Sequence, residues 1–528
     1  MNGSDEVWPD QHNKWIITLT VMMGAFMMTV NAQSVNVALP HMKGYFGTSI
    51  EEITWVSTGY ILATVIVMPL VGWLSARFGR RRFYMACIFI FIVSSILCGL
   101  AWNLPSIIVF RILQGVGGGT MMPVAQAILR EIFPPEEQGT AMGIFGLGVV
   151  LGPAVGPTVG GWLTDHYSWP WVFYINIPVS ITTFILAARY IHDPPYLKRD
   201  TGKIDFLGMV PMVIGLGAFQ LMLERGEIND WFASNFIVTL AIVALIGITL
   251  FVIREFRTDK PAVDLRLLRD VNFASGNVIG SIVSMGLFAG LFLLPLFLQR
   301  VLGYPAIDSG LALVPRSLAM AICMPIAGRL YNRVGPIVLI QGGLLLAGFS
   351  FWQLSRMTIA AGPWDIFWPQ FLQGMGVGMC FVSVTTAALT TIEKPKMTSA
   401  TGLYNFFRQT AGSIGIAGVA SQLARGENKY RAILVENVTD YRNATQDWMQ
   451  SASAIFGPQE SSAAIQDKVL KLMEVEMTRQ AALMSYNYVY FLIACLFFFA
   501  VPVALLFRVK GPAKEETIIE SSTQPEMD

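Results

Sequence analysis

The chain has 528 residues, of which 54% are hydrophobic and only 13% charged, and its formal net charge is +1. Soluble domains carry about a quarter charged residues, so this composition excludes an ordinary soluble protein and indicates a polytopic protein embedded in the lipid bilayer. Five widely spaced cysteines, four scattered histidines and the lack of a phosphate-binding loop argue against a metal site, a cofactor or an enzyme, and no nucleic-acid partner is expected.

The hydropathy pattern predicts an all-α membrane protein, because a hydrocarbon core of about 30 Å needs about 20 apolar residues per helix. Fourteen segments meet this requirement. They cover residues 14–38, 53–75, 83–102, 105–129, 138–163, 169–190, 204–223, 235–255, 272–299, 308–330, 336–356, 364–390, 398–421 and 485–508. No small-residue cleavage site accompanies the first span, which is therefore expected to be a retained helix.

The distribution of basic residues sets the predicted orientation. Arg and Lys concentrate in the connections after the even-numbered spans, whereas the other connections hold little beyond Lys43, Arg225, Arg300 and Arg356. Cytoplasmic connections of membrane proteins carry this excess of positive charge. Both termini are therefore expected in the cytoplasm, and the protein in the inner (plasma) membrane.

The fifth span contains a run of glycine and proline, GLGVVLGPAVGPTVGG, from Gly146 to Gly161. Each interior glycine costs a soluble helix about 1 kcal/mol and each proline about 3 kcal/mol, but membrane helices tolerate both because neighbouring helices satisfy the freed backbone groups. Four glycines spaced four apart form a stripe beside two prolines that are expected to bend the helix. They are Gly148, Gly152, Gly156 and Gly160, with Pro153 and Pro157. The stripe is either a close-packing face or the surface of a bending helix in a transporter.

A connection of about 60 residues, 422–485, separates the last two spans and contains stretches of helical periodicity such as residues 465–480. Long external connections often dock a partner or cap an exit. The alternative is a tolerated insertion.

Internal matches divide the chain into two related halves. GWLSARFG from Gly72 matches GRLYNRVG from Gly328, and LQGVG from Leu113 matches LQGMG from Leu372, both at an offset near 258 residues. Repeated halves of this kind are the architecture of alternating-access transporters. The expected organisation is an N-terminal segment 1–13, a six-helix half 14–190, two inserted helices with their flanking connections 191–271, a six-helix half 272–508, and a tail 509–528. The glycine stripe is then expected to lie between the halves.

Several motifs together resemble the major facilitator superfamily, and within it the fourteen-helix drug:proton antiporter family of the EmrB/QacA type. The resemblance rests on the connection motif after the second span, on RILQGVGGG from Arg111, on the glycine run, and on VNVALP, WPWVFYINIP, LMLERG, WPQFLQG and NFFRQTAGSIG. The connection motif contributes Gly72, Arg77, Gly79, Arg80 and Arg81. The resemblance implies a major facilitator fold and export of small lipophilic compounds, and it suggests that segment 422–485 docks a periplasmic adaptor protein.

Charged groups at membrane depth are the first candidates for proton coupling, because placing one there costs roughly 2.5–3.5 kcal/mol. Arg111 occupies the motif position that the family associates with coupling, while Arg316 and Arg408 are weaker candidates. Similar sequences carry an aspartate in the first span, where this chain has Asn31, which cannot titrate. The next candidate is Glu224 at the outer end of the seventh span, although an ordinary surface ion pair with Arg225 is the alternative.

Asp165 and Asp308, near the outer ends of their spans, are minor candidates for the coupling acid. Polar and aromatic residues on several spans are candidates for lining an amphipathic cavity. They are Asn31, Gln33, Asn36, Gln126, Gln220, Gln341, Trp368 and Gln370.

The expected function is secondary active efflux of lipophilic or amphipathic compounds, driven by the proton gradient without any cofactor, with the chain acting as the permease of a pump that spans the cell envelope. The absence of an acid at Asn31 keeps open a differently coupled or uncoupled exporter of a lipid or metabolite. A membrane scaffold or receptor without transport is the alternative from another class.

Overall fold

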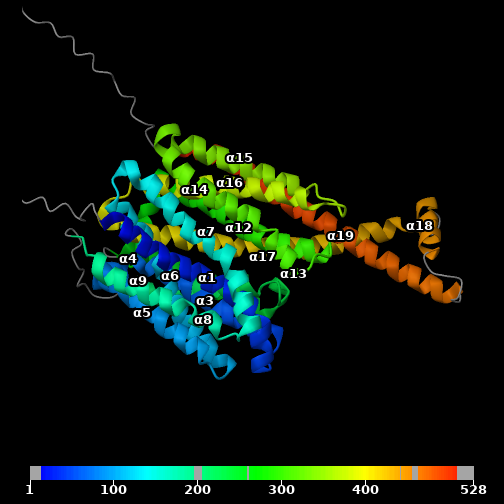
Figure 1. Ribbon diagram of the computed structural model, residues 1–528, viewed down its shortest axis with the longest axis horizontal. Helices are drawn as coiled ribbons and strands as arrows, with labels where there is room; N and C mark the ends of the chain where they lie inside the picture. Colours follow the sequence, from blue (N-terminus) through cyan, green and yellow to red (C-terminus); the bar gives the residue numbers. More distant parts are fainter. Residues whose placement is uncertain (1–12, 195–204, 259–260, 440–441, 455–461, 508–528) are drawn as a thin grey trace, which may run out of the picture.

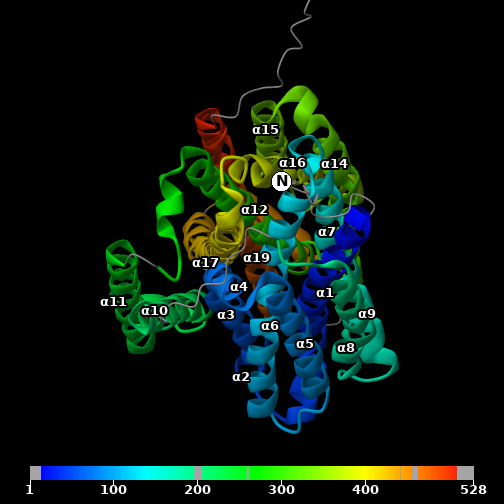
Figure 2. The ribbon, with the colours of Figure 1, turned by 90° about the vertical axis from the view of Figure 1, so that its left-hand side faces the viewer.

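The computed structural model describes residues 13–194, 205–258, 261–439, 442–454 and 462–507. All the regular elements in these ranges are helices, and thirteen helical segments are long and apolar enough to cross a membrane. The prediction of an all-α, multi-pass membrane protein is thereby confirmed. Figures 1 and 2 show the helices as one elongated bundle.

Most of the N-terminal half forms the lower part of the bundle in Figure 2, while α7 (Pro135–His166) reaches up beside α14 (Val314–Val334) and α16 (Pro363–Ala388) of the other half. Its helices are α1 (Lys14–Phe46), α2 (Ile50–Ile53), α3 (Trp55–Val67), η2 (Met68–Leu70), α4 (Val71–Phe78), α5 (Arg80–Gly99), α6 (Leu104–Ile132), α7 (Pro135–His166), α8 (Trp171–Tyr174) and α9 (Asn176–Tyr190). α3, η2 and α4 together make one span.

Two inserted helices follow and lie at the side of the bundle (Figure 2). They are α10 (Phe206–Arg225) and α11 (Asn235–Arg257), joined through η3 (Trp231–Ala233), and η4 (Leu265–Arg269) leads on to the second half. α10 and α11 pack closely on each other through Gly215 and Gly247, where a Cβ at either position would lie 2.6 Å from backbone atoms of the other helix.

The C-terminal half consists of α12 (Val271–Arg300), α13 (Ala306–Leu311), α14 (Val314–Val334), α15 (Pro336–Leu354), α16 (Pro363–Ala388), η5 (Lys394–Lys396), α17 (Met397–Asn437), α18 (Asn443–Ser453), α19 (Ser462–Ala500) and η6 (Pro502–Leu506). Proline stands in the first turn of α14, α15 and α16, where its missing N–H breaks no helical hydrogen bond.

The connection 422–485 is mostly helical in its described residues, including the stretch 465–480 whose periodicity is helical. α17 continues to Asn437 and α19 begins at Ser462, and the two helices project beyond the bundle with α18 at their tip (Figure 1). Arg431 Nη2 donates to Glu474 Oε1 at 2.8 Å between them. Long stretches without proline allow both helices to continue past the rest of the bundle. We call residues 427–439, α18 and residues 462–478 the projecting hairpin.

α17 contains the predicted span 398–421 but does not reach the hydropathy of a membrane helix, unlike the other thirteen predicted spans. Its polar residues include Asn405, Arg408, Thr410 and Ser413. α17 nevertheless lies inside the bundle, in contact with α12 and α19 of its own half, with α4 and α6 of the other half, and with α10. The polarity of α17 therefore comes from side chains that face other helices.

Candidate functional site

The two halves contact each other closely at the end of the bundle where α1 begins, which we call the terminal end. A Cβ built on Gly328 of α14 would lie 2.3 Å from the carbonyl oxygen of Gly139 of α7, and one on Gly139 would lie 2.5 Å from that of Gly328. A Cβ on Gly72 of α4 would lie 2.6 Å from the Cα of Ser399 of α17. Glycine is required at these positions because the neighbouring atoms belong to backbones and cannot move aside.

These contacts follow the internal repeat. Gly72 and Gly328 are the matched glycines of the two connection motifs, and each packs on the opposite half. The glycines that end these motifs, Gly79 and Gly335, have φ of 84° and 91°, and each separates one helix from the next. The duplicated motif therefore gives each half one contact of this kind, as expected for a pair of halves related by a pseudo-two-fold axis.

The glycine stripe of the fifth span is a close-packing face. The sequence predicted that this stripe lies between the halves, and this prediction is wrong, because the stripe packs on α1 of the same half. Cβ atoms on Gly148, Gly152, Gly156 and Gly160 would lie within 3 Å of α1 atoms, from Met22 to Ser34. α1 belongs to the same half, and Ser34 Oγ donates to the carbonyl of Gly156 at 2.8 Å. α7 runs unbroken through Pro153 and Pro157. Contact with the other half comes from earlier residues of α7, including Gly143, whose Cβ would lie 2.6 Å from the Met324 carbonyl oxygen.

Arg111 is completely enclosed in the N-terminal half, without a carboxylate in hydrogen-bonding range among the described residues. Its guanidinium donates to Asn31 Oδ1 and Gln114 Oε1, both at 2.6 Å, and to the Val56 carbonyl at 3.1 Å. It also lies 4.2 Å from the centre of the Tyr60 ring. Asn31 therefore occupies the place of a counter-ion but supplies only a neutral acceptor. The arrangement satisfies the cation without a carboxylate among the described residues around it.

The C-terminal half contains two further arginines inside the bundle: Arg316 is buried and Arg408 is half-buried. Arg316 Nη1 of α14 donates to Gln373 Oε1 at 3.3 Å, and Gln373 is the repeat partner of Gln114. Arg408 of α17 donates to Ser284 Oγ at 3.4 Å and lies 4.4 Å from the Phe381 ring centre, while its Nη1 has no hydrogen-bond partner. Neither is joined to a carboxylate by an ion pair in the described chain.

α17 receives one amide side chain from the N-terminal half and another from the inserted helices. Asn405 Nδ2 donates to Gln126 Oε1 of α6 at 2.6 Å. Gln220 Nε2 of α10 donates to Ser413 Oγ at 2.8 Å and to Glu224 Oε1 at 3.1 Å. Two of the predicted cavity residues therefore form hydrogen bonds that cross from one part of the molecule to another.

Glu224 is hydrogen-bonded to Gln220, the residue that connects α10 to α17, and it is not paired with Arg225. The Arg225 guanidinium turns toward the N-terminal half, where it lies 4.4 Å from the centre of the Trp55 ring and donates to the Glu51 carbonyl at 3.1 Å. No ion pair joins the two neighbours, although both are described. The structure therefore contradicts the simple surface pair and leaves Glu224 bonded to the amide that also contacts α17.

The remaining predicted residues are scattered. Asn36 accepts a hydrogen bond from Ser57 at 2.8 Å, and Gln33 packs on Gly156. Gln370 is buried with an unpartnered Oε1. Trp368 lines a cavity between α15 and α16 of a single half, away from the contacts between halves.

The minor acid candidates lie near the surface. Asp165 is largely exposed, 3.7 Å from His41. Asp308 lines a second cavity, beside the start of α16.

The connection motif after the second span anchors the terminal end. Arg80 forms an ion pair with Glu131 of α6, and both side chains are buried. The backbone N–H of Arg81 donates to Asp193 Oδ1 at 2.7 Å, and the Arg81 side chain donates to the Ala188 carbonyl. Arg77 lies in the last turn of α4. The arginines of the motif thus tie α5 to α6 and to the end of α9.

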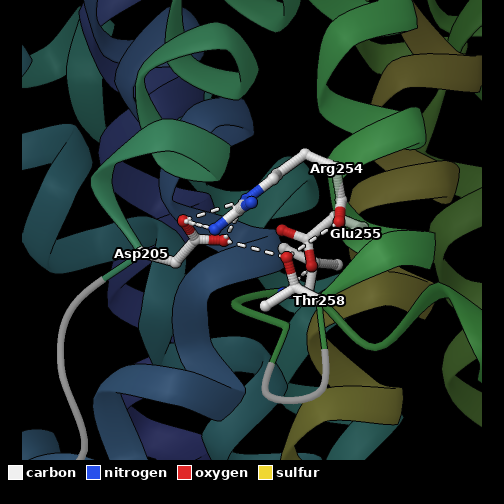
Figure 3. A network of polar contacts seen from close by, with 5 residues as sticks. Asp205, Arg254, Glu255 and Thr258 are labelled. Atoms are coloured by element: carbon white, nitrogen blue, oxygen red, sulfur yellow. Dashed lines mark hydrogen bonds and ion pairs between the residues drawn. The ribbon is translucent and has the colours of Figure 1, made fainter.

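The sequence did not single out a polar cluster at the terminal end of the inserted helices (Figure 3). Arg254 of α11 forms a bidentate contact with Asp205, with both Nε–Oδ2 and Nη2–Oδ1 at 3.1 Å, and Thr258 lies beside it. Glu255 is 2% exposed, its Oε1 has no hydrogen-bond partner, and its Oε2 accepts from the Val263 N–H at 3.4 Å. Glu255 resembles any charged residue at the end of a span, and it is buried only in the folded chain, where Gly208 of α10 and the linker from Ala262 onward pack against it.

Comparisons with known proteins agree with this architecture. The family model described as Major Facilitator Superfamily matches residues 21–416. The chain is 32% identical to the fatty acid resistance protein FarB of Neisseria gonorrhoeae, covering 93% of this chain and 95% of that protein. It is 30% identical to the multidrug export protein EmrB of Escherichia coli, covering 94% and 95%.

A third relative is the colistin resistance protein EmrB of Acinetobacter baumannii, 32% identical over 78% of this chain and 80% of that protein. Among solved structures, the human organic anion transporter MFSD10 (TETRAN) matches with a TM-score of 0.59 at 12% identity, covering 92% of this chain and 99% of that one, which is a likeness of fold. The chain belongs to the major facilitator superfamily, among its EmrB-like transporters, and is not an enzyme.

Proposed function

We propose that this protein exports lipophilic or amphipathic compounds from the cytoplasm in exchange for protons. The relatives named for multidrug export and for resistance to fatty acids or colistin support the efflux class. The observation that carries the coupling proposal is the contact of Glu224, through Gln220, with Ser413 of α17. An acid in this position can gain or lose a proton as the halves move.

In this mechanism the chain spans the membrane fourteen times with both termini cytoplasmic, and α17 is the polar span. The closed terminal end is then the cytoplasmic gate. A substrate leaves at the opposite end of the bundle, where the projecting hairpin lies, which we call the hairpin end. Asn31, Gln33, Gln126, Gln220 and Gln370 provide hydrogen-bonding groups for the cavity. Trp368 is left out of this cavity because it lies within one half.

The energy available is sufficient for such a pump. A membrane potential of 100 mV supplies about 2.3 kcal/mol per proton, and one pH unit supplies about 1.4 kcal/mol. Together they support a gradient of roughly 500-fold for a neutral substrate exchanged for one proton. The test uses proteoliposomes with an imposed pH gradient, in which a lipophilic substrate should collapse the gradient only when the protein is present. Substrate movement without proton movement would instead favour the differently coupled or uncoupled exporter.

We further propose that the projecting hairpin docks a periplasmic adaptor, so that the protein works as the permease of an envelope-spanning pump. Its helices expose apolar side chains that no described segment covers. They include Ile433, Val435, Leu470, Leu472 and Val475. Exposed apolar surface beyond the bilayer is typical of a protein interaction site.

Replacing residues 430–475 with a short Gly/Ser linker should abolish efflux from whole cells and spare transport in inverted membrane vesicles. A short linker can close the gap because Arg431 and Glu474 are in contact. The shortened protein keeps two hydrogen bonds at the base of the hairpin. Ser485 donates to the Leu423 carbonyl, and Arg479 donates to the Val301 carbonyl. Loss of both activities would show that the hairpin belongs to the transport machinery itself, and retention of both would remove the adaptor proposal.

A further inference from the structure

A cavity of about 400 Å³ opens at the hairpin end of the C-terminal half, between the end of α15 and the start of α16. The residues that line it all come from these two helices and the connection between them, so it does not belong to the contact between halves. α15 lies at the edge of the bundle (Figures 1 and 2). Since both helices are membrane spans, their shared connection lies at a membrane–water interface.

The rim of this cavity has the character of an interface that contacts lipid. Trp364 and Trp368 line it and are 68% and 54% exposed. Tryptophan is enriched at the level of lipid headgroups, where its ring is half in apolar surroundings and half in polar ones. Below them, α15 exposes Leu345 and Phe349, which offer an apolar surface to acyl chains.

Two opposite charges line the same cavity, and neither is neutralised within the described part of the chain. The Arg356 guanidinium lies 4.0 Å from the centre of the Trp352 ring and forms no ion pair. The Asp365 carboxylate accepts from the Gly362 N–H at 2.8 Å and contacts no cation. Gln353 adds an amide oxygen without a hydrogen-bond partner. The cavity therefore holds one strong anion-binding group and two acceptors for N–H donors.

We infer that this cavity binds the headgroup of a zwitterionic phospholipid with a primary ammonium, a phosphatidylethanolamine. The phosphate is bound by Arg356, a geometry that guanidinium favours. The ammonium donates to Asp365 and Gln353 and lies against the tryptophan rings. A phosphatidylcholine headgroup has no N–H to donate, and a phosphatidylglycerol headgroup has no cation, so neither uses all of these groups.

The test measures lipid retention without any transport assay, so its outcome is independent of the proposed efflux. The full-length protein is placed in nanodiscs of phosphatidylglycerol containing an equal fraction of phosphatidylethanolamine or phosphatidylcholine, and the retained lipids are counted by native mass spectrometry. We expect phosphatidylethanolamine to be retained at least about tenfold over phosphatidylcholine. Asp365→Asn should remove this preference, and Arg356→Gln should lower the retention of both lipids because both carry the phosphate.

Asparagine at 365 can still accept the Gly362 N–H, so this variant should keep the start of α16 intact. Arg425→Gln serves as the control, because Arg425 is an exposed cation on α17 that lines neither described cavity. Equal retention of the two lipids in the unmodified protein, a preference that survives Asp365→Asn, or unchanged retention of both lipids in Arg356→Gln would overturn the assignment. Soluble phosphoethanolamine that displaces the lipid at similar concentration would show that the headgroup alone is the ligand, and would also overturn it.

Discussion

Gly328→Ala should strongly reduce transport by forcing apart the halves at the terminal end. The new Cβ would lie 2.3 Å from the Gly139 carbonyl oxygen and 3.1 Å from the Thr140 Cα, both backbone atoms. Overpacking of this kind costs about 1–3 kcal/mol. Since the strain is present only when the halves are together, it should shift the equilibrium toward the separated state by roughly 10- to 100-fold.

Gly342→Ala is the matched control for this substitution. It places the same methyl group in the neighbouring helix α15, where it meets only the Met379 Cε at 3.5 Å, an ordinary contact. Both substitutions raise helix propensity by about 1 kcal/mol, so any difference between them reports the contact with α7. If Gly328→Ala transports as well as Gly342→Ala, the closed terminal end is not a state through which transport passes.

The separation itself can be measured by double electron–electron resonance. Spin labels at Phe78 and Lys394 lie on opposite halves at the terminal end, and both residues are exposed. Cys495 is the one exposed cysteine in the described residues and is first replaced by Ser. We expect longer distances in Gly328→Ala and an unchanged distribution in Gly342→Ala. An unchanged distribution in both variants would contradict the proposed strain.

Glu224→Gln should abolish transport driven by a pH gradient while leaving the protein folded and able to exchange substrate for substrate. Glutamine keeps an oxygen that can accept from Gln220 Nε2, so the hydrogen bonds from α10 to Ser413 are preserved. What is lost is the ability to bind and release a proton. We expect substrate counterflow near the wild-type rate and gradient-driven uptake reduced at least about 100-fold, as for removal of an essential acid–base group.

The control is Glu227→Gln, which removes a carboxylate three residues further along the chain. Glu227 accepts from Trp231 Nε1 at 2.8 Å within the same connection, and its carboxylate is not hydrogen-bonded to any described residue of α17. Proton-driven uptake in proteoliposomes should be close to wild type in this variant. Wild-type coupling in Glu224→Gln would remove Glu224 from the mechanism and direct attention to other acids such as Glu255.

The two halves place their buried cations differently, even though their glycines correspond. Cβ atoms on the matched Gly115 and Gly374 would lie 2.5 Å and 2.2 Å from the carbonyl oxygens of Tyr60 and Arg316. Arg316 of the second half therefore occupies the place of Tyr60 in the first, where Arg111 lies over the ring. Each half keeps a buried arginine bonded to its repeated glutamine, Gln114 or Gln373. The duplicated fold thus preserves the backbone contacts and the glutamine, and changes the helix that supplies the cation.

The spans were predictable because burial in a bilayer demands length and apolar composition, which are local properties of the chain. The repeat was also predictable from local properties. Gly79 and Gly335 both adopt a positive φ, which favours glycine, so the same residue recurs at matching positions of the two motifs. Segment 422–485 was less well predicted. Its helical periodicity was visible in the sequence, but an isolated helix gains little stability from periodicity alone. The pairing of α17 with α19, which extends both helices beyond the bundle, could not be read from it.

The sequence by itself therefore determined an all-helical, duplicated membrane protein of the major facilitator superfamily, and it pointed to Arg111, Asn31 and Glu224. Only the tertiary structure decided which surfaces meet. It placed the glycine stripe on α1 within one half, turned Arg225 away from Glu224 toward Trp55, and buried Glu255 under the linker. Residue spacing defines the face of a helix, but the partner of that face comes from elsewhere in the chain and is decided by packing.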